Sequence, residues 1–114
     1  MELLVRKSDE IYIIDVSGEM DLYNSYKLKE LVSKMLDKGV KMFVINMEQV
    51  DYIDSSGIGS LIYLCTTIKK MELNLFISNV QSSVQKVIEL TKLGKFFPII
   101  DTVDNAVLKL NEKK

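Results

Sequence analysis

The sequence has no histidine and no tryptophan, one proline and one cysteine. Without histidine, the chain lacks the usual general base of hydrolytic enzymes and the commonest nitrogen ligand of metal ions. This absence excludes Ser-His-Asp and Cys-His catalysis. The single thiol, Cys65, cannot form a disulfide within the chain, which agrees with a reducing compartment.

Long apolar runs and an excess of one charge are also missing. The longest apolar runs have about four residues, as at 42–45, whereas a membrane-spanning helix needs about 20. The N-terminus lacks the basic start and the longer apolar run of a signal peptide. With 15 basic and 16 acidic residues, the net charge is −1, without the basic excess typical of nucleic-acid binders. We therefore expect a cytoplasmic protein with no membrane and no nucleic acid among its partners.

The composition is typical of one soluble globular domain. Of 114 residues, 47% are hydrophobic and 27% are charged, so we expect a single domain over residues 1–114. Apolar periodicity and turn residues predict strands at 3–7 and 11–16 joined by a polar turn, a loop at 17–21, a helix at 23–38, a strand at 41–47, a helix at 56–70, a strand at 73–77, a helix at 81–92, a strand at 96–100 and a short helix from 104.

The order of these elements predicts an α/β fold. A hairpin opens the sheet and later strands alternate with helices, so we predict a mixed, mostly parallel sheet with about four helices. Pro98 cannot donate to a strand ladder, which predicts that the last strand lies at an edge. Cys65 falls on the apolar face of its helix and is predicted to be a core residue. Asp21 or Asn24 is predicted to cap the first helix.

The segment at 50–61 links the central strand to the second helix and carries the most informative residues. Asp54, Ser55 and Ser56 are each able to cap that helix, and capping alone is one interpretation. Two hydroxyls beside a carboxylate at a helix N-terminus suggest more. A phosphate placed there is expected to meet unpaired backbone N–H groups and the positive end of the helix dipole. The site is therefore predicted to accept a phosphoserine.

Two glycines in the same segment point beyond capping. Gly57 and Gly59 both fall in the first helical turn, where each costs up to about 1 kcal/mol relative to alanine. A cap does not require them. They favour either a sharp start of the helix or the close approach of another molecule's backbone.

At this point the chain resembles a known family. The run Asp54-Ser55-Ser56-Gly57-Ile58-Gly59, preceded by an apolar strand, resembles the phosphorylation motif of the anti-sigma factor antagonists, which are STAS domains. The run Gly18-Glu19-Met20-Asp21 matches their Gly-Glu-hydrophobic-Asp loop before the first helix. The resemblance covers nearly the full length and implies the STAS fold.

The resemblance implies a partner switch rather than catalysis, with no cofactor. The unphosphorylated domain would bind an anti-sigma factor that is also a serine kinase and so release a sigma factor; phosphorylation of Ser55 would end the binding, and a serine phosphatase would reset the cycle. Ser56 is the secondary candidate for phosphorylation, and Asp54 would orient the turn. The predicted partner-binding residues are Gly18, Glu19, Met20, Asp21, Asp54, Ser56, Gly57, Ile58 and Gly59. We expect Met20 and Tyr23 to be exposed near the serine, and the protein to be a monomer or a weak dimer.

Three alternatives remain. The first is a STAS docking or assembly subunit of a stress-signalling or transporter complex that is never phosphorylated. The second is a receiver domain phosphorylated on Asp54, but the opening pair of strands contradicts the strict strand–helix alternation of receivers. The third is an enzyme, yet no Ser-x-x-Lys follows Ser55, and no Cys/His metal cluster or phosphate-binding Gly-Lys-Ser/Thr loop is present.

Overall fold

The computed structural model describes residues 1–113, so the last residue of the predicted domain lies outside the described part. The elements follow the predicted order: β1 (Glu2–Ser8), β2 (Ile11–Met20), α1 (Tyr26–Asp37), β3 (Met42–Ile53), α2 (Ser55–Lys70), β4 (Asn74–Ser78), α3 (Ser82–Leu90), β5 (Ile99–Ile100) and α4 (Val103–Asn111). None of the helices within this range combines the length and the apolar character needed to cross a bilayer.

The sheet confirms the predicted α/β architecture. Its strand order is β1-β2-β3-β4-β5, with β1 antiparallel to β2 and every other neighbouring pair parallel. The hairpin turns at Asp9, whose φ of 54° is left-handed. The edge position of β5 is also confirmed, but this strand is shorter than predicted. Phe96 and Phe97 instead form a turn in which both N–H groups donate to the carbonyl of Leu93.

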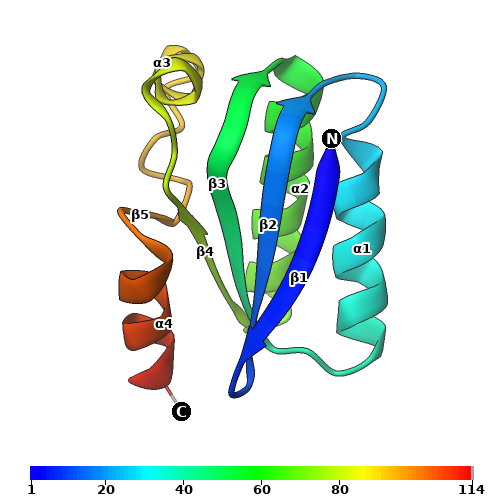
Figure 1. The fold of residues 1–114 in the computed structure, drawn as a ribbon, viewed down its shortest axis with the longest axis vertical. Coiled ribbons are helices and arrows are strands. Elements are labelled where there is room, and N and C mark those ends of the chain that lie inside the picture. The colour runs from blue at the N-terminus through cyan, green and yellow to red at the C-terminus, as the bar shows by residue number, and fades with distance from the viewer. Residues whose placement is uncertain (114) are drawn as a thin grey trace.

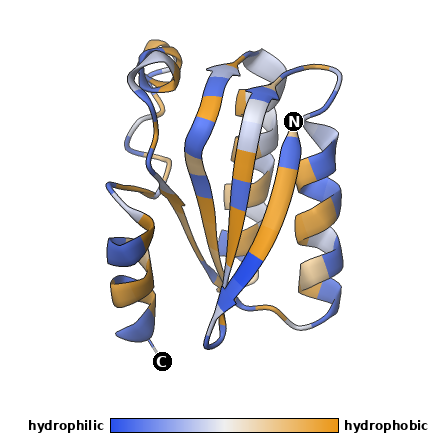
Figure 2. Cartoon of the chain, in the orientation of Figure 1, coloured by the Kyte–Doolittle hydropathy of each residue, from blue (hydrophilic) through white to orange (hydrophobic). Residues whose placement is uncertain are grey.

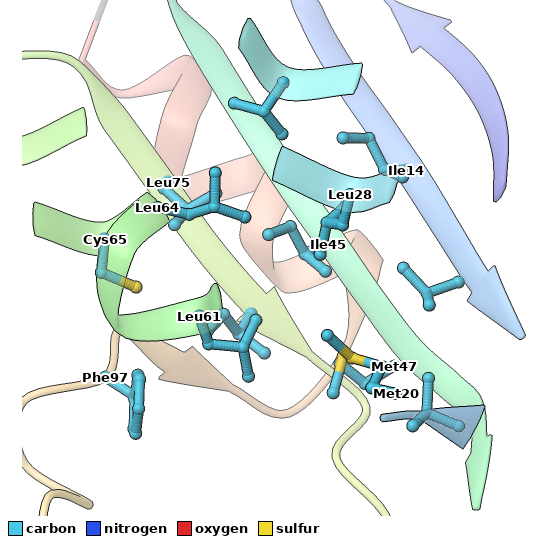
Figure 3. Packing of buried hydrophobic residues seen from close by; sticks show 14 of the residues in the cluster. Ile14, Met20, Leu28, Ile45, Met47, Leu61, Leu64, Cys65, Leu75 and Phe97 are labelled. Atoms are coloured by element: carbon cyan, nitrogen blue, oxygen red, sulfur yellow. The ribbon is translucent and has the colours of Figure 1, made fainter. Parts of the chain in front are cut away.

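The helices form layers on the two faces of the sheet (Figure 1). α2 lies behind the strands and α1 lies to its side, beyond β1, whereas α4 lies on the opposite side of the view, beside β4 and β5. Hydrophobic residues gather on the strands and on one side of the helices, whereas the turn between β1 and β2 is hydrophilic (Figure 2). The larger core lies between the sheet, α1 and α2 (Figure 3), and the smaller one lies under α4, around Ala106 and Leu110.

The second helix buries the face that its sequence predicts, with one change. Ile58, Leu61, Cys65 and Ile68 are all buried. Ile62, which the helical spacing also places on this apolar face, is only partly buried, and Leu64 occupies the core instead. The prediction of a core cysteine is confirmed, because Cys65 is buried. This burial raises the pKa of its thiol to about 12.

Two strands run further than predicted, and this extension builds the site. β2 continues through residues 17–20, where a loop was expected, and β3 continues to Ile53 instead of ending at Met47. The two ends pair with each other, with Gly18 opposite Val50 and Met20 opposite Ile53. Register shifts between Asp15 and Ser17 and again after Gly18 break the alternation that usually marks a strand in sequence.

Candidate functional site

The predicted phosphoacceptor stands where the extended β3 passes into α2. Asp54 is the N-cap of α2, with extended backbone angles, and Ser55 is the first helical residue. The backbone N–H of Asp54 donates to the carbonyl of Met20 at 3.1 Å, which joins the ends of β2 and β3. Ser55 is exposed and Ser56 is half-buried. The side chain that caps α2 is that of Asp54, and the Ser55 hydroxyl takes no part in this cap.

The Asp54 carboxylate holds this corner together with both of its oxygens. Oδ1 accepts hydrogen bonds from the N–H groups of Ser56 (2.9 Å) and Gly57 (3.1 Å), which satisfies donors that a helix start leaves free. Oδ2 accepts from the N–H of Leu22 at 3.2 Å and so ties the loop after β2 to the helix. Of the three residues able to cap α2, Asp54 is therefore the one that does so.

This arrangement corrects one expectation about a phosphate at the site. The N–H groups of Ser56 and Gly57 are already bonded to Asp54, and the N–H of Ile58 donates to the Asp54 carbonyl at 3.0 Å. A phosphate on Ser55 would therefore compete with the Asp54 carboxylate for these donors rather than find them unpaired.

The loop between β2 and α1 is a turn fixed by its own side chains. The carboxylate of Asp21 accepts from the N–H of Tyr23 (2.9 Å), and the side chain of Asn24 accepts from the N–H of Asp21 (3.0 Å). Neither Asp21 nor Asn24 caps α1, contrary to prediction, because each is committed to this turn. The helix begins later than predicted, after Ser25, whose side chain makes no capping bond.

The turn holds two apolar side chains out in solvent beside Asp54. Leu22 is 68% exposed and Tyr23 is 83% exposed. Tyr26, at the start of α1, and Tyr52, near the end of β3, are each about half exposed. We call these four residues, which belong to the two segments joined by the hydrogen bond between Leu22 and Asp54, the apolar rim. The expectation that Tyr23 is exposed is confirmed, whereas the other three members were not predicted; an apolar pair inside an otherwise polar loop was the available signal.

Several predicted contact residues lie inside the fold. Met20 is fully buried in the core, so its predicted exposure is wrong, and Ile58 is buried as well. Gly57 is buried, and a Cβ placed on it would lie 2.6 Å from both Cγ1 of Ile53 and the carbonyl oxygen of Met20. These side chains cannot touch a partner in this conformation. The close approach that Gly57 permits is made within the chain.

The remaining predicted contacts differ in their accessibility. A Cβ at Gly59 would meet nothing within 4 Å, so this position is open on its outer side. Glu19 is exposed, and Asp21 is half-buried. Gly18 has a φ of +94°, which an L side chain rarely adopts, so it serves the irregular end of β2. Residues 1–113 contain no group of three or more acidic or cysteine side chains that could hold a metal ion.

Comparison with known proteins agrees with this geometry. The family model described as the STAS domain matches residues 2–106. An anti-sigma-B factor antagonist of Staphylococcus aureus is 29% identical over 85 residues, covering 75% of this chain and 79% of that protein.

Solved structures show the same fold. The anti-sigma factor antagonist SpoIIAA in its unphosphorylated form has a TM-score of 0.82 at 20% identity, covering 97% of both chains. Its phosphorylated form has a TM-score of 0.74 at 20% identity, covering 96% of this chain and 99% of that one. This chain is a member of the STAS domain family.

Proposed function

We propose that this protein is an anti-sigma factor antagonist switched by phosphorylation of Ser55. In the unphosphorylated state it binds an anti-sigma factor that is also a serine kinase, and the sigma factor is released. The kinase then transfers a phosphoryl group to Ser55, binding ends, and a serine phosphatase restores the hydroxyl. The observation that carries the proposal is an exposed serine at the first position of α2, next to exposed apolar side chains and not needed for the cap.

The apolar rim supports a docking surface around the serine. Leu22 and Tyr23 are exposed neighbours in one turn, and exposed apolar patches and tyrosine side chains are both typical of protein interfaces. Leu22 is positioned by the same carboxylate that caps the helix of Ser55, and Tyr23 by the carboxylate of Asp21 in the same turn. We therefore place the partner across the rim and Ser55, with Glu19, Asp21, Ser56 and Gly59 at its margin.

The charge of a phosphoserine explains why binding would end. The group carries about −1.5 to −2 charges near pH 7 and would stand next to the Asp54 carboxylate. Two unit charges about 4 Å apart interact by roughly 4 kcal/mol at an effective dielectric constant near 20, of which only part survives solvent screening. A remaining penalty of about 1.4–3 kcal/mol would weaken binding about tenfold to more than a hundredfold.

The occupied N–H groups indicate where the domain itself would respond. If the phosphate draws the N–H groups of Ser56 and Gly57 away from Asp54, the link from Asp54 to Leu22 is also disturbed. We expect amide NMR shifts at residues 20–26 and 53–60 on phosphorylation, with the core strands unchanged. Shifts throughout β3 and α4 would instead indicate refolding and would contradict a switch at the surface.

Four proteins test the assignment: wild type, Ser55→Ala, Ser55→Asp and the neighbouring control Ser56→Ala. We expect wild type, Ser55→Ala and Ser56→Ala to capture an ATP-binding kinase from an extract of the source cells, and Ser55→Asp to lose it. With the captured kinase and ATP, intact mass should show one added phosphate on wild type and Ser56→Ala but none on Ser55→Ala. Equal capture by all four, or a phosphate on Ser55→Ala, would defeat the proposal. The same mass measurement separates it from a docking subunit that is never phosphorylated.

A further inference from the structure

A hollow of about 490 Å³ lies at the opposite end of α2 from Ser55. It is bounded by the last turns of α2, by the segment that enters β4 and by the turn before β5, with Lys113 from the C-terminal end of the described chain. Pockets that hold small molecules typically measure about 300–1,000 Å³ and are mostly apolar with a few polar groups. The hollow therefore has the size of a ligand site, and the function proposed for Ser55 does not use it.

The inner wall of the hollow is apolar. Ile68 and Leu75 are buried core residues that line it, and the Cys65 thiol lies beside them. Because burial raises the pKa of this thiol to about 12, it stays uncharged near neutral pH and counts as part of the apolar wall. Phe96 and Pro98 form the outer side, and Phe96 remains 42% exposed although its ring packs edge-on against Phe97.

The mouth of the hollow is polar and carries more positive than negative charge. Lys69 and Lys113 line it together with a single carboxylate, Glu72. This local excess contrasts with the net charge of −1 of the whole chain. A second, separate hollow of about 310 Å³ shares Glu72 and Lys113 with the first, and it adds one further lysine, Lys41, and one further carboxylate, Glu10. An apolar wall with two lysines and one carboxylate at its edge is complementary to a small anion with an apolar body.

We propose that this hollow binds a small amphipathic carboxylate with an unbranched apolar chain, such as a medium-chain fatty acid. The chain lies against Ile68, Leu75 and Phe96, and the carboxylate lies between Lys69 and Lys113. The proposal is independent of Ser55, so either assignment can fail without the other.

Methyl and amide NMR titrations with three probes of equal chain length test the chemistry: octanoate, octylamine and 1-octanol. For a ligand of this size we expect a saturable shift with octanoate at a Kd of about 0.1–5 mM. The affected methyls should be those of Ile68, Leu73 and Leu75. Octylamine should bind at least about fivefold more weakly, because its ammonium meets two lysines. Equal binding of all three probes, or no saturable shift with octanoate at these residues, would overturn the proposal.

Four variants test the location. Lys69→Ala combined with Lys113→Ala should weaken octanoate binding about three- to tenfold, as for loss of partly exposed ion pairs. Lys86→Ala, at an exposed position on α3 that lines neither hollow, is the matched control and should leave binding unchanged. Cys65→Leu should fill the inner end and weaken binding at least threefold, and Phe96→Ala tests the outer wall if the leucine variant does not fold. Unchanged affinity in the lysine variant, or in the wall variant that folds, would contradict the site.

Discussion

Gly57 and Gly59 stand two positions apart at the start of α2, and the fold uses them in different ways. The α-carbon of Gly57 faces Ile53 and Met20 so closely that a methyl group would collide with both, whereas that of Gly59 faces open space. The same contrast between buried and exposed residues holds for the whole site. Met20, Ile58 and Gly57 are held inside, whereas Ser55 and the apolar rim are presented to solvent. The difference teaches that part of the motif packs inside the corner while the rest stays exposed to solvent.

One added methyl group at each glycine should give the largest difference in stability between the two positions. Gly57→Ala should lower the free energy of unfolding by about 1–3 kcal/mol, because Ile53 and the backbone of Met20 must move. Gly59→Ala should leave it unchanged or raise it by up to about 1 kcal/mol, since alanine favours a helix and meets no neighbour. Urea denaturation of both variants measures the contrast, and equal effects would show that the two glycines do not differ in role.

Asp54 bonds the start of α2 through Oδ1 and the exposed loop residue Leu22 through Oδ2. Two substitutions distinguish the loss of the whole carboxylate from the loss of one oxygen. Asp54→Ala should cost about 1–2 kcal/mol of stability through loss of the cap and of the bond to Leu22. Asp54→Asn keeps one side-chain oxygen and should cost less, about 0.5–1 kcal/mol. Asp51→Ala, at an exposed position on β3, is the control and should stay within about 0.5 kcal/mol of wild type. A loss as large in the control as in Asp54→Ala would mean that the carboxylate does not hold the corner.

Cys65 and Ser55 both lie on α2, Cys65 buried and Ser55 exposed, and the pH dependence of stability tests the burial of Cys65. The folded thiol has a pKa of about 12, above the value of about 8.5 in an unfolded chain, so above pH 8.5 only the unfolded chain loses its proton. Stability should thus be complete below that pH and decline as pH rises toward 12. Between pH 7.5 and pH 10 we expect wild type to lose about 1–2 kcal/mol more than Cys65→Ala in urea denaturation. Parallel losses in both proteins would show that the thiol is not sealed in the core.

The apolar rim should contribute least to stability and most to binding. Tyr23→Ser should change the free energy of unfolding by less than about 0.5 kcal/mol, because the side chain is 83% exposed. If it is an anchor of the interface, the same change should weaken kinase binding at least about tenfold. Leu108→Ser, at a position 62% exposed on α4, is the matched control and should affect neither quantity. Unchanged binding in Tyr23→Ser would remove this residue from the docking surface.

The sequence predicted the element order, the mixed sheet and the position of Ser55, because apolar periodicity and turn residues are local signals. It did not predict the far ends of β2 and β3. After Met47, the buried residues of β3 are Val50 and Ile53, three positions apart, because the register shifts against β2 break the period of two. A prediction from local sequence patterns therefore ends both strands too early.

Only part of the site could be predicted, because some of its features depend on contacts between residues that are far apart in the sequence. The serine, the carboxylate and the glycines could be read from one short segment. The exposure of Leu22 and the burial of Met20 depend instead on the long-range bond from Leu22 to Asp54 and on the pairing of Met20 with Ile53. When such distant contacts determine the outcome, the sequence alone does not show whether an apolar loop residue will be buried or exposed.

The central claim is that one exposed hydroxyl at the start of α2 controls whether a partner stays bound. Calorimetric titration of the purified kinase, without nucleotide, with unphosphorylated and with Ser55-phosphorylated protein tests it most directly. We predict that phosphorylation weakens the binding at least about tenfold. Equal affinity of the two forms would contradict the account.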